Sequence, residues 1–253
     1  MDKRKESIWL YWDNKPGCIS PPEYIQLCWA TIQKHCSKDF EIKMVNTDNV
    51  KQFLPNISEQ FFTISQINNK SNYLRYHLLK EHGGVWLDSD LILFKSLKPM
   101  LNLLTDEIDL VATASPTLKY GQPESGFIVS KKNGLIISKA VSLIDHCINL
   151  QKPGHVFKWG SLGPGILRQA VSKHRYHHLD HRLMMPIASW EAFRFEGKEP
   201  MDRYIIQDSF GCMLFHEMFR QSNSKFLSMT KEQIMESDTF LGGLFRKAII
   251  DDG

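Results

Sequence analysis

Short apolar runs alternate with amphipathic stretches along the first half of the chain. The apolar and aromatic run at 7–12 predicts a buried strand, and Pro21-Pro22 after it is typical of a helix start. Residues 40–45 alternate apolar with charged side chains, which predicts a second strand. This order of strand, helix and strand is typical of a parallel sheet.

A stronger helical pattern follows at 72–82. We predict Ser71 as its N-cap, because a serine hydroxyl can accept a hydrogen bond from a backbone N–H of the first turn. Gly83 and Gly84 end the helix, and their backbone freedom lets the chain reverse tightly into the next strand. Further strands are predicted at 85–87, 91–94, 110–113, 126–130, 185–187 and 212–215, and further helices at 50–54, 58–64, 135–150, beyond 165 and within 231–250.

No repeat, low-complexity tract or long linker divides the sequence. We therefore predict one α/β domain over 1–253, with 231–250 as a C-terminal helical segment. The apolar residues of that segment either pack against the domain or rest against a membrane. We favour packing and keep peripheral membrane contact as the alternative.

The charges are nearly balanced, with 31 Lys and Arg against 28 Asp and Glu, and they do not gather in a basic block. We therefore expect no nucleic-acid partner. No apolar run approaches the roughly 18 residues of a membrane span. The five cysteines are an odd number without a Cys-x-x-Cys pair, which indicates free thiols in a reducing compartment. We expect a cytoplasmic chain, with attachment to the inner face of the membrane as the alternative.

Two carboxylates, Asp88 and Asp90, come directly after the apolar strand 85–87. In an extended segment residues i and i+2 point the same way, so both side chains would face one point. Two carboxylates in this arrangement repel each other unless a cation lies between them. Oxygen ligands favour Mg²⁺ or Mn²⁺ as that cation. Such a pair at the carboxyl end of a strand lies where α/β sheets bind their ligands.

The preceding helix supports this interpretation. Asn72 and Arg75 are three residues apart and share a helix face. A guanidinium beside a metal-bound diphosphate could pair with phosphate or sugar oxygens. A surface ion pair is the alternative role for Arg75, and its position near Asp88 and Asp90 favours the site.

The stretch from Ser71 to Phe94, with its Asn, Arg, Gly-Gly and Asp-x-Asp, resembles the DXD glycosyltransferases of family 32, the capsular polysaccharide synthesis and mannosyltransferase-like group. It is also similar to the catalytic domain of the clostridial glucosylating toxins. Weaker matches are the opening strand, the Pro-Glu-Tyr-x-x-x-Cys-Trp helix, the Gly163-Pro164 loop and a late histidine.

The resemblance implies a GT-A fold, a Rossmann-like mixed central sheet flanked by helices. It also implies transfer of a sugar, with retention, from a nucleotide-sugar donor that we expect to be a UDP-sugar. A divalent Mn²⁺ or Mg²⁺ would be required. The implied acceptor is a saccharide or lipid-linked oligosaccharide in bacterial surface or capsular polysaccharide synthesis.

Site residues follow from the same resemblance. Asp88 and Asp90 would hold Mn²⁺ on the donor diphosphate, and Asp90 is counted with the catalytic residues. Arg75 would contact the donor sugar and its leaving oxygen. Trp12 would stack on the nucleobase, although a core aromatic is the alternative. Asn72 stands where the family usually has an Asp that bonds a donor-sugar hydroxyl, so no relative's sugar preference is transferred.

Three further positions are weighed. His216 follows an apolar run near the C-terminus, where GT-A enzymes often place a third metal or diphosphate ligand, but a structural histidine is as common. Glu124, at the entrance to the strand 126–130, could orient the acceptor or stabilise an oxocarbenium-like state. An ordinary strand-end acid is the other interpretation. Gly163 resembles the family's Gly-Pro loop and is assigned to the donor-binding set.

Other interpretations stay open. His174, His177, His178 and His181 have a helical spacing, but a solvated loop is favoured over a metal site. A haloacid-dehalogenase-type phosphotransferase also carries Asp-x-Asp after an apolar strand, but Ile92 stands where that class expects Thr or Val. The chain could also be a non-catalytic nucleotide-sugar-binding subunit of a polysaccharide assembly complex.

Overall fold

The computed structural model describes residues 5–14, 17–115, 122–152, 154–172 and 174–250. The chain forms two compact units. The first unit comprises 1–13, 40–88 and 99–179, and the second comprises 14–39, 89–98 and 180–253. The single-domain organisation stays a prediction.

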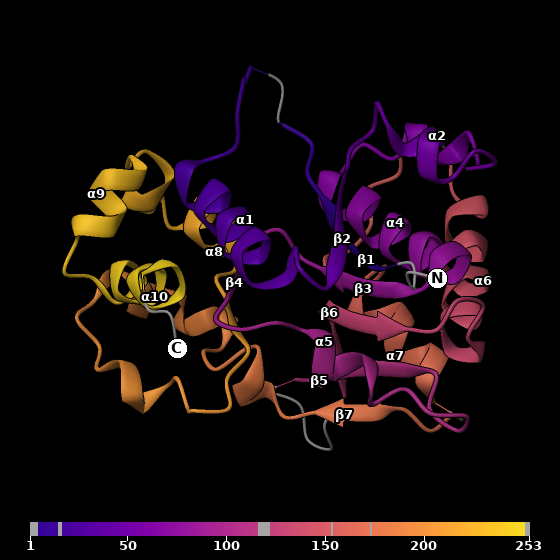
Figure 1. Cartoon of the computed structure of the whole chain (residues 1–253). Helices are drawn as coiled ribbons and strands as arrows, with labels where there is room; N and C mark the ends of the chain where they lie inside the picture. The colour runs from indigo at the N-terminus through magenta and orange to yellow at the C-terminus, as the bar shows by residue number, and fades with distance from the viewer. Residues whose placement is uncertain (1–4, 15–16, 116–121, 153, 173, 251–253) are drawn as a thin grey trace. The chain divides into compact units, whose positions relative to one another are not determined.

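A six-stranded sheet is the centre of the first unit (Figure 1). Its order is β2-β1-β3-β6-β5-β7, with parallel pairs β1/β2, β1/β3 and β5/β7 and antiparallel pairs β3/β6 and β5/β6. The predicted α/β class with a mixed central sheet is therefore confirmed. The strands are β1 (Glu6–Tyr11), β2 (Phe40–Val45), β3 (Gly84–Leu87), β5 (Leu110–Ala114), β6 (Pro123–Ser130) and β7 (His177–Leu179).

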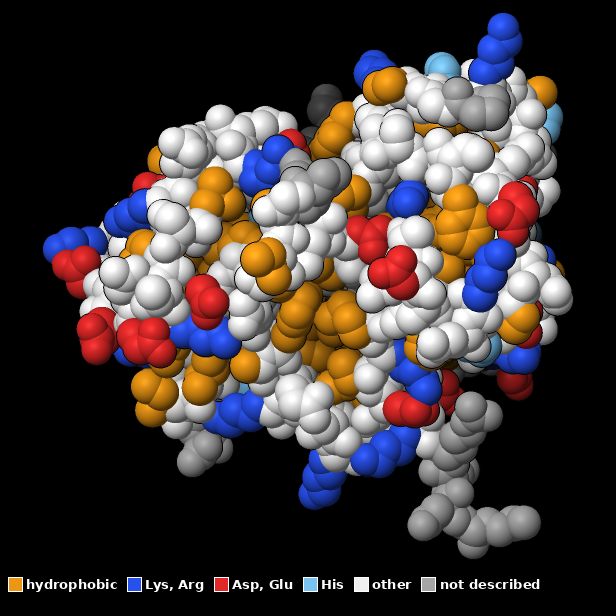
Figure 2. Space-filling view, turned by 90° about the horizontal axis from the view of Figure 1, so that it is seen from above, with side chains coloured by type: hydrophobic (Ala, Val, Ile, Leu, Met, Phe, Trp, Pro, Cys, Tyr) orange, Lys and Arg blue, Asp and Glu red, His pale blue; other side chains and the backbone are white. Residues whose placement is uncertain are grey.

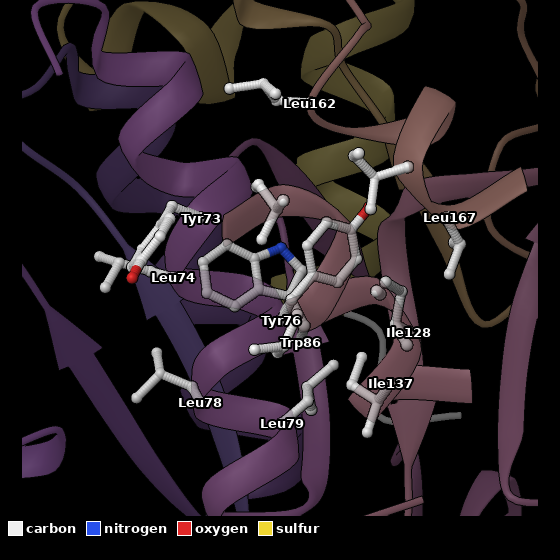
Figure 3. Close-up of a cluster of buried hydrophobic side chains, with 14 of the residues drawn as sticks. Tyr73, Leu74, Tyr76, Leu78, Leu79, Trp86, Ile128, Ile137, Leu162 and Leu167 are labelled. Atoms are coloured by element: carbon white, nitrogen blue, oxygen red, sulfur yellow. The ribbon is translucent and has the colours of Figure 1, made fainter. Parts of the chain in front are cut away.

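One face of this sheet carries the main hydrophobic core. Trp9, Trp86, Ile128 and Ala112 are in register across four neighbouring strands, and each is at most 2% exposed. Their side chains pack in one cluster with residues of α4 (Ile67–His82), α6 (Leu135–Asn149) and α7 (Pro164–Val171) (Figure 3). Burial of this many large apolar side chains is the main driving force for the fold. The shorter helices are α2 (Val50–Phe53), α3 (Gln60–Thr63) and α5 (Lys98–Leu101).

The second unit is mainly helical around a two-stranded antiparallel sheet. That sheet pairs β4 (Leu91–Leu93) with β8 (Gly211–Met213), and α1 (Glu23–Cys36) packs on β4. The other α-helices are α8 (His216–Gln221), α9 (Lys231–Glu236) and α10 (Phe240–Ile249). Short 3-10 helices lie at His181–Leu183, Ser189–Glu196, Met201–Arg203 and Lys225–Leu227.

The C-terminal segment uses its apolar side for packing. Phe240, Leu241, Leu244 and Phe245 of α10 are at most 3% exposed, and α10 contacts α1 and α9. This is the arrangement favoured from the sequence. Across the described residues, we find no helix with the length and apolar character that a membrane crossing requires. Lys and Arg side chains are interspersed with Asp and Glu on the face shown in Figure 2, as the sequence predicts.

The start of α4 was predicted wrongly. The helix begins at Ile67 after an N-cap at Gln66, so Ser71 is not the cap but lies inside the helix. Its hydroxyl oxygen lies 3.3 Å from Nη2 of Arg75, which donates to it. The first turn carries Asn68, Asn69 and Lys70, whose polar character hides the apolar period from the sequence pattern.

Two predicted strands also differ. Residues 185–187 form no strand, because Pro186 has no N–H to donate to a ladder. The strand after Asp90 does not resume the main sheet but pairs with β8 in the second unit. A turn at Ser89 and Asp90 separates it from β3, so the extended Asp88–Asp90 segment assumed from the sequence is wrong.

The histidine-rich segment was favoured as a loop, but His177–Leu179 form β7 and pair in parallel with β5. Successive side chains of a strand point to opposite faces. His177 and His178 therefore lie on different faces of the sheet.

Gly84 gives a direct test of how the α4–β3 turn is built. Its φ is +93°, and a Cβ there would lie 2.3 Å from the backbone oxygen of Ser7 on β1. We expect Gly84→Ala to lower the free energy of unfolding by about 3 kcal/mol or more, because neither strand can move away. Gly154 has a similar φ of +80° but nothing within 4 Å, so Gly154→Ala should cost about 1 kcal/mol. Urea unfolding of both variants checks this, and equal losses would contradict it.

Candidate functional site

Asp88 lies at the carboxyl end of β3 and is held by two donors. Nη2 of Arg75 and Nε1 of Trp86 each lie 2.9 Å from Oδ1 of Asp88. The Asp88 backbone N–H donates to the carbonyl of Gly126 on β6 at 2.8 Å. The Asp88 side chain is 31% exposed, whereas that of Arg75 is 5% exposed. One carboxylate oxygen is thus fixed by the protein, while the group as a whole still reaches solvent.

The Arg75 guanidinium is buried among several compensating groups. Besides Asp88 it contacts the carbonyl oxygen of Ser125 through Nη1 and the Ser71 hydroxyl, and its centre lies 5.2 Å from the Trp86 ring. A buried charge costs several kcal/mol unless it is paired and hydrogen-bonded, so these contacts are what allow a cation at this depth. They also fix the orientation of the guanidinium relative to Asp88.

Asn72 and Gly163 lie against each other. Asn72 is 7% exposed and lies one turn before Arg75 on α4. A Cβ on Gly163 would be 2.7 Å from Oδ1 of Asn72, so a larger residue there would force the Asn72 side chain to shift. The Gly163 carbonyl accepts a hydrogen bond from Tyr76 at 2.6 Å. The structure therefore brings together two of the residues assigned to the donor, next to Arg75.

Glu124 lies inside β6, since this strand begins three residues earlier than predicted. Its Oε1 is 2.8 Å from Nη2 of Arg168 on α7. Burial raises the pKa of Glu124, while hydrogen bonding to Ser115 and the charge of Arg168 act in the opposite direction. Glu124 is therefore one half of a partly buried ion pair inside β6, and its role at the site stays a prediction.

Trp12 follows the last residue of β1. Its backbone N–H donates to the Val45 carbonyl at 3.1 Å, and the residue is half-buried. Because β1 and β3 are parallel, Trp12 and Asp88 lie at the same edge of the sheet. The next residue, Asp13, accepts a hydrogen bond from the Thr47 backbone N–H at 2.9 Å, which fixes the loop after Trp12.

Asp90 and His216 meet in the second unit. The His216 backbone N–H donates to Oδ2 of Asp90 at 2.6 Å, and the Leu214 N–H donates to the Asp90 carbonyl at 3.0 Å. The His216 ring bonds through Nδ1 to the hydroxyl of Tyr24 on α1. Burial raises the pKa of Tyr24, and the charge of Asp90 raises it further. Two residues predicted as metal ligands, 126 positions apart in the sequence, are thus neighbours.

These donors suit a divalent ion in part. Carboxylate oxygens and an imidazole are ligands that Mn²⁺ accepts, and such ions complete their shell with water and substrate phosphates. Among the residues that the structure describes, no three His, Cys, Asp or Glu side chains form a ready cluster for a metal. The joint use of Asp88, Asp90 and His216 as ligands stays a prediction.

Residues 1–145 match the family described as capsular polysaccharide synthesis protein. The chain belongs to this family. The membership agrees with the resemblance seen at 71–94, and the matched range contains Trp12, Asn72, Arg75, Asp88, Asp90 and Glu124.

Among curated proteins, the chain is similar to Glycosyltransferase afumC of Aspergillus fumigatus. The two are 24% identical over 216 residues, which cover 80% of this chain and 50% of that protein. The chain thus spans about half the length of this curated relative.

The solved structures to which the chain is similar include several glycosyltransferases. GlyE from Streptococcus pneumoniae TIGR4, in its apo form, is 18% identical, with 93% of this chain and 64% of that chain covered and a TM-score of 0.48. The galactosyltransferase LgtC in complex with donor and acceptor sugar analogs is 11% identical, with 90% and 98% covered and a TM-score of 0.46.

Arg168, like Trp86 and Tyr24, is a residue of this site that the sequence did not reveal. It lies on α7, 44 positions after Glu124, and nothing in the local pattern pairs the two. The only available signal is its place one turn after Gly163-Pro164, a loop that was itself assigned to the site.

The ion pair with Glu124 can be tested by its pH dependence. We expect Arg168→Met to raise the pKa of Glu124 further, because burial then acts without the opposing cation. An acid with a raised pKa binds its proton more tightly in the folded chain. The contribution of Glu124 to the free energy of unfolding is therefore lost as the pH rises above 4.5, the ordinary pKa of a glutamate. This loss is larger in Arg168→Met, because the pKa of Glu124 is raised further there. A carbon-13 NMR titration of the carboxyl groups measures the shift.

Arg175→Met is the control for this titration, because Arg175 pairs with Glu107 at the surface, with 81% of its side chain exposed. It should leave the Glu124 titration unchanged. An identical Glu124 titration in the wild type and in Arg168→Met would show that Arg168 does not control this carboxyl.

Proposed function

We propose that this chain is a metal-dependent, retaining glycosyltransferase that uses a nucleotide-sugar donor. Its family and the name of its fungal relative support the class of reaction. The observation that carries the proposal is the buried Arg75 paired with a partly exposed Asp88 at the carboxyl edge of parallel strands. This edge is where α/β sheets bind their ligands.

The donor would lie along this edge. The Arg75 guanidinium would bond the diphosphate or the leaving oxygen, because a planar fork of donors matches phosphate oxygens. The Asn72 amide would bond a donor-sugar hydroxyl, in a position shaped by Gly163. Trp12 would stack on the base, a contact of about 1–3 kcal/mol in comparable sites. We propose a UDP-sugar as the donor.

Asp88, Asp90 and His216 would hold Mn²⁺ or Mg²⁺ in this proposal. When bound, the ion supplies positive charge that offsets the charge growing on the departing nucleoside diphosphate. Arg75 adds to this stabilisation from the protein side. Its guanidinium is already oriented by Asp88 and Ser125, so little reorganisation is needed.

Transfer would proceed by same-face attack of an acceptor hydroxyl. The bond between the anomeric carbon and the diphosphate oxygen breaks, a bond to the acceptor oxygen forms, and the acceptor proton passes to the leaving diphosphate. Glu124, kept close to Arg168, would orient the acceptor or stabilise the oxocarbenium-like state. Positioning of the two substrates would supply much of the rate.

The acceptor in this proposal is a saccharide or a lipid-linked oligosaccharide of surface or capsular polysaccharide synthesis. The family description supports this class of pathway. The buried apolar side of α10 does not provide a membrane-binding surface, so any lipid-linked acceptor would have to be presented by another part of the chain or by a partner.

The proposal is tested by measuring nucleoside diphosphate release from a panel of nucleotide sugars with Mn²⁺. We expect Asp88→Asn and Arg75→Met to lower the rate roughly 100-fold or more, because each removes charge stabilisation of the leaving group. Asp106→Asn, at an exposed aspartate in the same unit, is the matched control and should keep the wild-type rate. Circular dichroism and an unfolding midpoint confirm that each variant is folded.

Full activity in Asp88→Asn would rule out the proposed role of this carboxylate. Binding of a nucleotide sugar without release or transfer for any acceptor would instead indicate a non-catalytic binding subunit.

A further inference from the structure

A concave site lies on a different side of α4 from Arg75. It is a cavity of about 200 Å³ between α4, α6 and the segment that connects α2 to α3. Tyr73 and His77 border it, one helical turn apart. Figure 3 shows Tyr73 and Tyr76 on different sides of α4, with Tyr76 directed toward Leu167 of α7. The described residues that line the cavity include neither Arg75 nor Asp88, so the cavity is separate from the Arg75–Asp88 site.

The cavity has an apolar floor and a polar rim. Ile57 and Ile148, which border it, are at most 9% exposed. Asn56, Ser58 and Asn149 border it as well and are exposed. This combination presents carbon surface at the bottom and hydrogen-bonding groups at the mouth.

One carboxylate in the cavity is held in place by a histidine. Nε2 of His77 lies 3.0 Å from Oδ1 of Asp145, and the two side chains are 18% and 38% exposed. The His77 ring stacks on Tyr73, with centroids 4.0 Å apart and an angle of 21° between the planes. Burial and the charge of Asp145 raise the pKa of Tyr73, so its hydroxyl stays protonated. The carboxylate thus has a defined position without being sealed from solvent.

The residues that line the cavity indicate which class of ligand it can bind. No Lys or Arg is among the described residues that border the cavity, and its carboxylate would repel a phosphate. A single carboxylate with one histidine is too few protein ligands for a structural zinc site. Amides, a hydroxyl and a carboxylate around an apolar floor fit a neutral ring that bears several hydroxyls. The volume is below the roughly 300–1,000 Å³ of sites for drug-sized ligands, which suits one sugar ring and not a nucleotide sugar.

We infer that this cavity is a saccharide-binding subsite for one neutral sugar residue, separate from the proposed donor site. Asp145 would accept hydrogen bonds from sugar hydroxyls, and Asn56 and Asn149 would donate and accept at the rim. The carbon–hydrogen face of the ring would lie on Ile57 and Ile148. In a glycosyltransferase, such a subsite would bind a sugar residue of a saccharide chain that is not the residue taking part in the transfer.

The test is titration of the isotope-labelled whole chain with neutral monosaccharides, namely glucose, galactose, mannose and N-acetylglucosamine, followed by amide NMR. We expect at least one of them to shift resonances of 56–60 and 145–149 in a saturable way, with a millimolar dissociation constant. Asn149→Ala and Asp145→Asn should each weaken that binding about tenfold, the effect of losing one good hydrogen bond. Asn102→Ala, at an exposed asparagine of the same unit, should leave it unchanged.

Two results would overturn the inference. One is the absence of saturable shifts at these residues with all four sugars. The other is an unaltered affinity in both Asn149→Ala and Asp145→Asn, which would place the sugar elsewhere. If Asp145→Asn lowers the unfolding midpoint but leaves the sugar affinity unchanged, the His77–Asp145 pair only stabilises the packing of α4 against α6. Binding measured in Asp88→Asn separates this inference from the proposed function, since the subsite should be intact where donor cleavage is lost.

Discussion

The ion pair between Arg75 and Asp88 is the constraint around which the first unit is arranged. A guanidinium that is 5% exposed requires a compensating carboxylate, and the residue directly after β3 supplies it. The pair therefore fixes how α4 lies on the sheet. Trp86 contributes to both partners, because its N–H donates to Asp88 and its ring lies beside the Arg75 guanidinium. The core and the candidate site are thus linked through one side chain.

This constraint explains the backbone around it. Arg75 and Asp88 are only 13 residues apart, so α4 must reverse into β3 within a tight turn. Gly83 and Gly84 make that turn with φ values of +74° and +93°, close to the backbones of residues 130–132 and of Ser7. On the other side of the site, Gly163 packs closely against Asn72, and Arg168 forms an ion pair with Glu124. The buried and partly buried charges here occur in opposite pairs, which lowers the cost of their desolvation.

Local signals predicted much of this arrangement from the sequence. The β-α-β opening, the Gly83-Gly84 turn and the shared face of Asn72 and Arg75 depend on neighbouring residues, and the structure has all three. The prediction failed where distant segments decide the outcome. The Glu124–Arg168 pair and the pairing of β4 with β8 each join residues far apart in the sequence. The Ser71 cap failed because polar residues hid the first turn of α4.

The most direct test of the central claim is calorimetric titration of the chain with UDP in the presence and absence of Mn²⁺. If Asp88 and Arg75 form the diphosphate site, Mn²⁺ should strengthen UDP binding at least tenfold in the wild type. Asp88→Asn should abolish that gain, and Arg75→Met should weaken binding with or without the ion. Equal UDP affinity in the wild type and in both variants would show that the nucleotide does not bind at this ion pair.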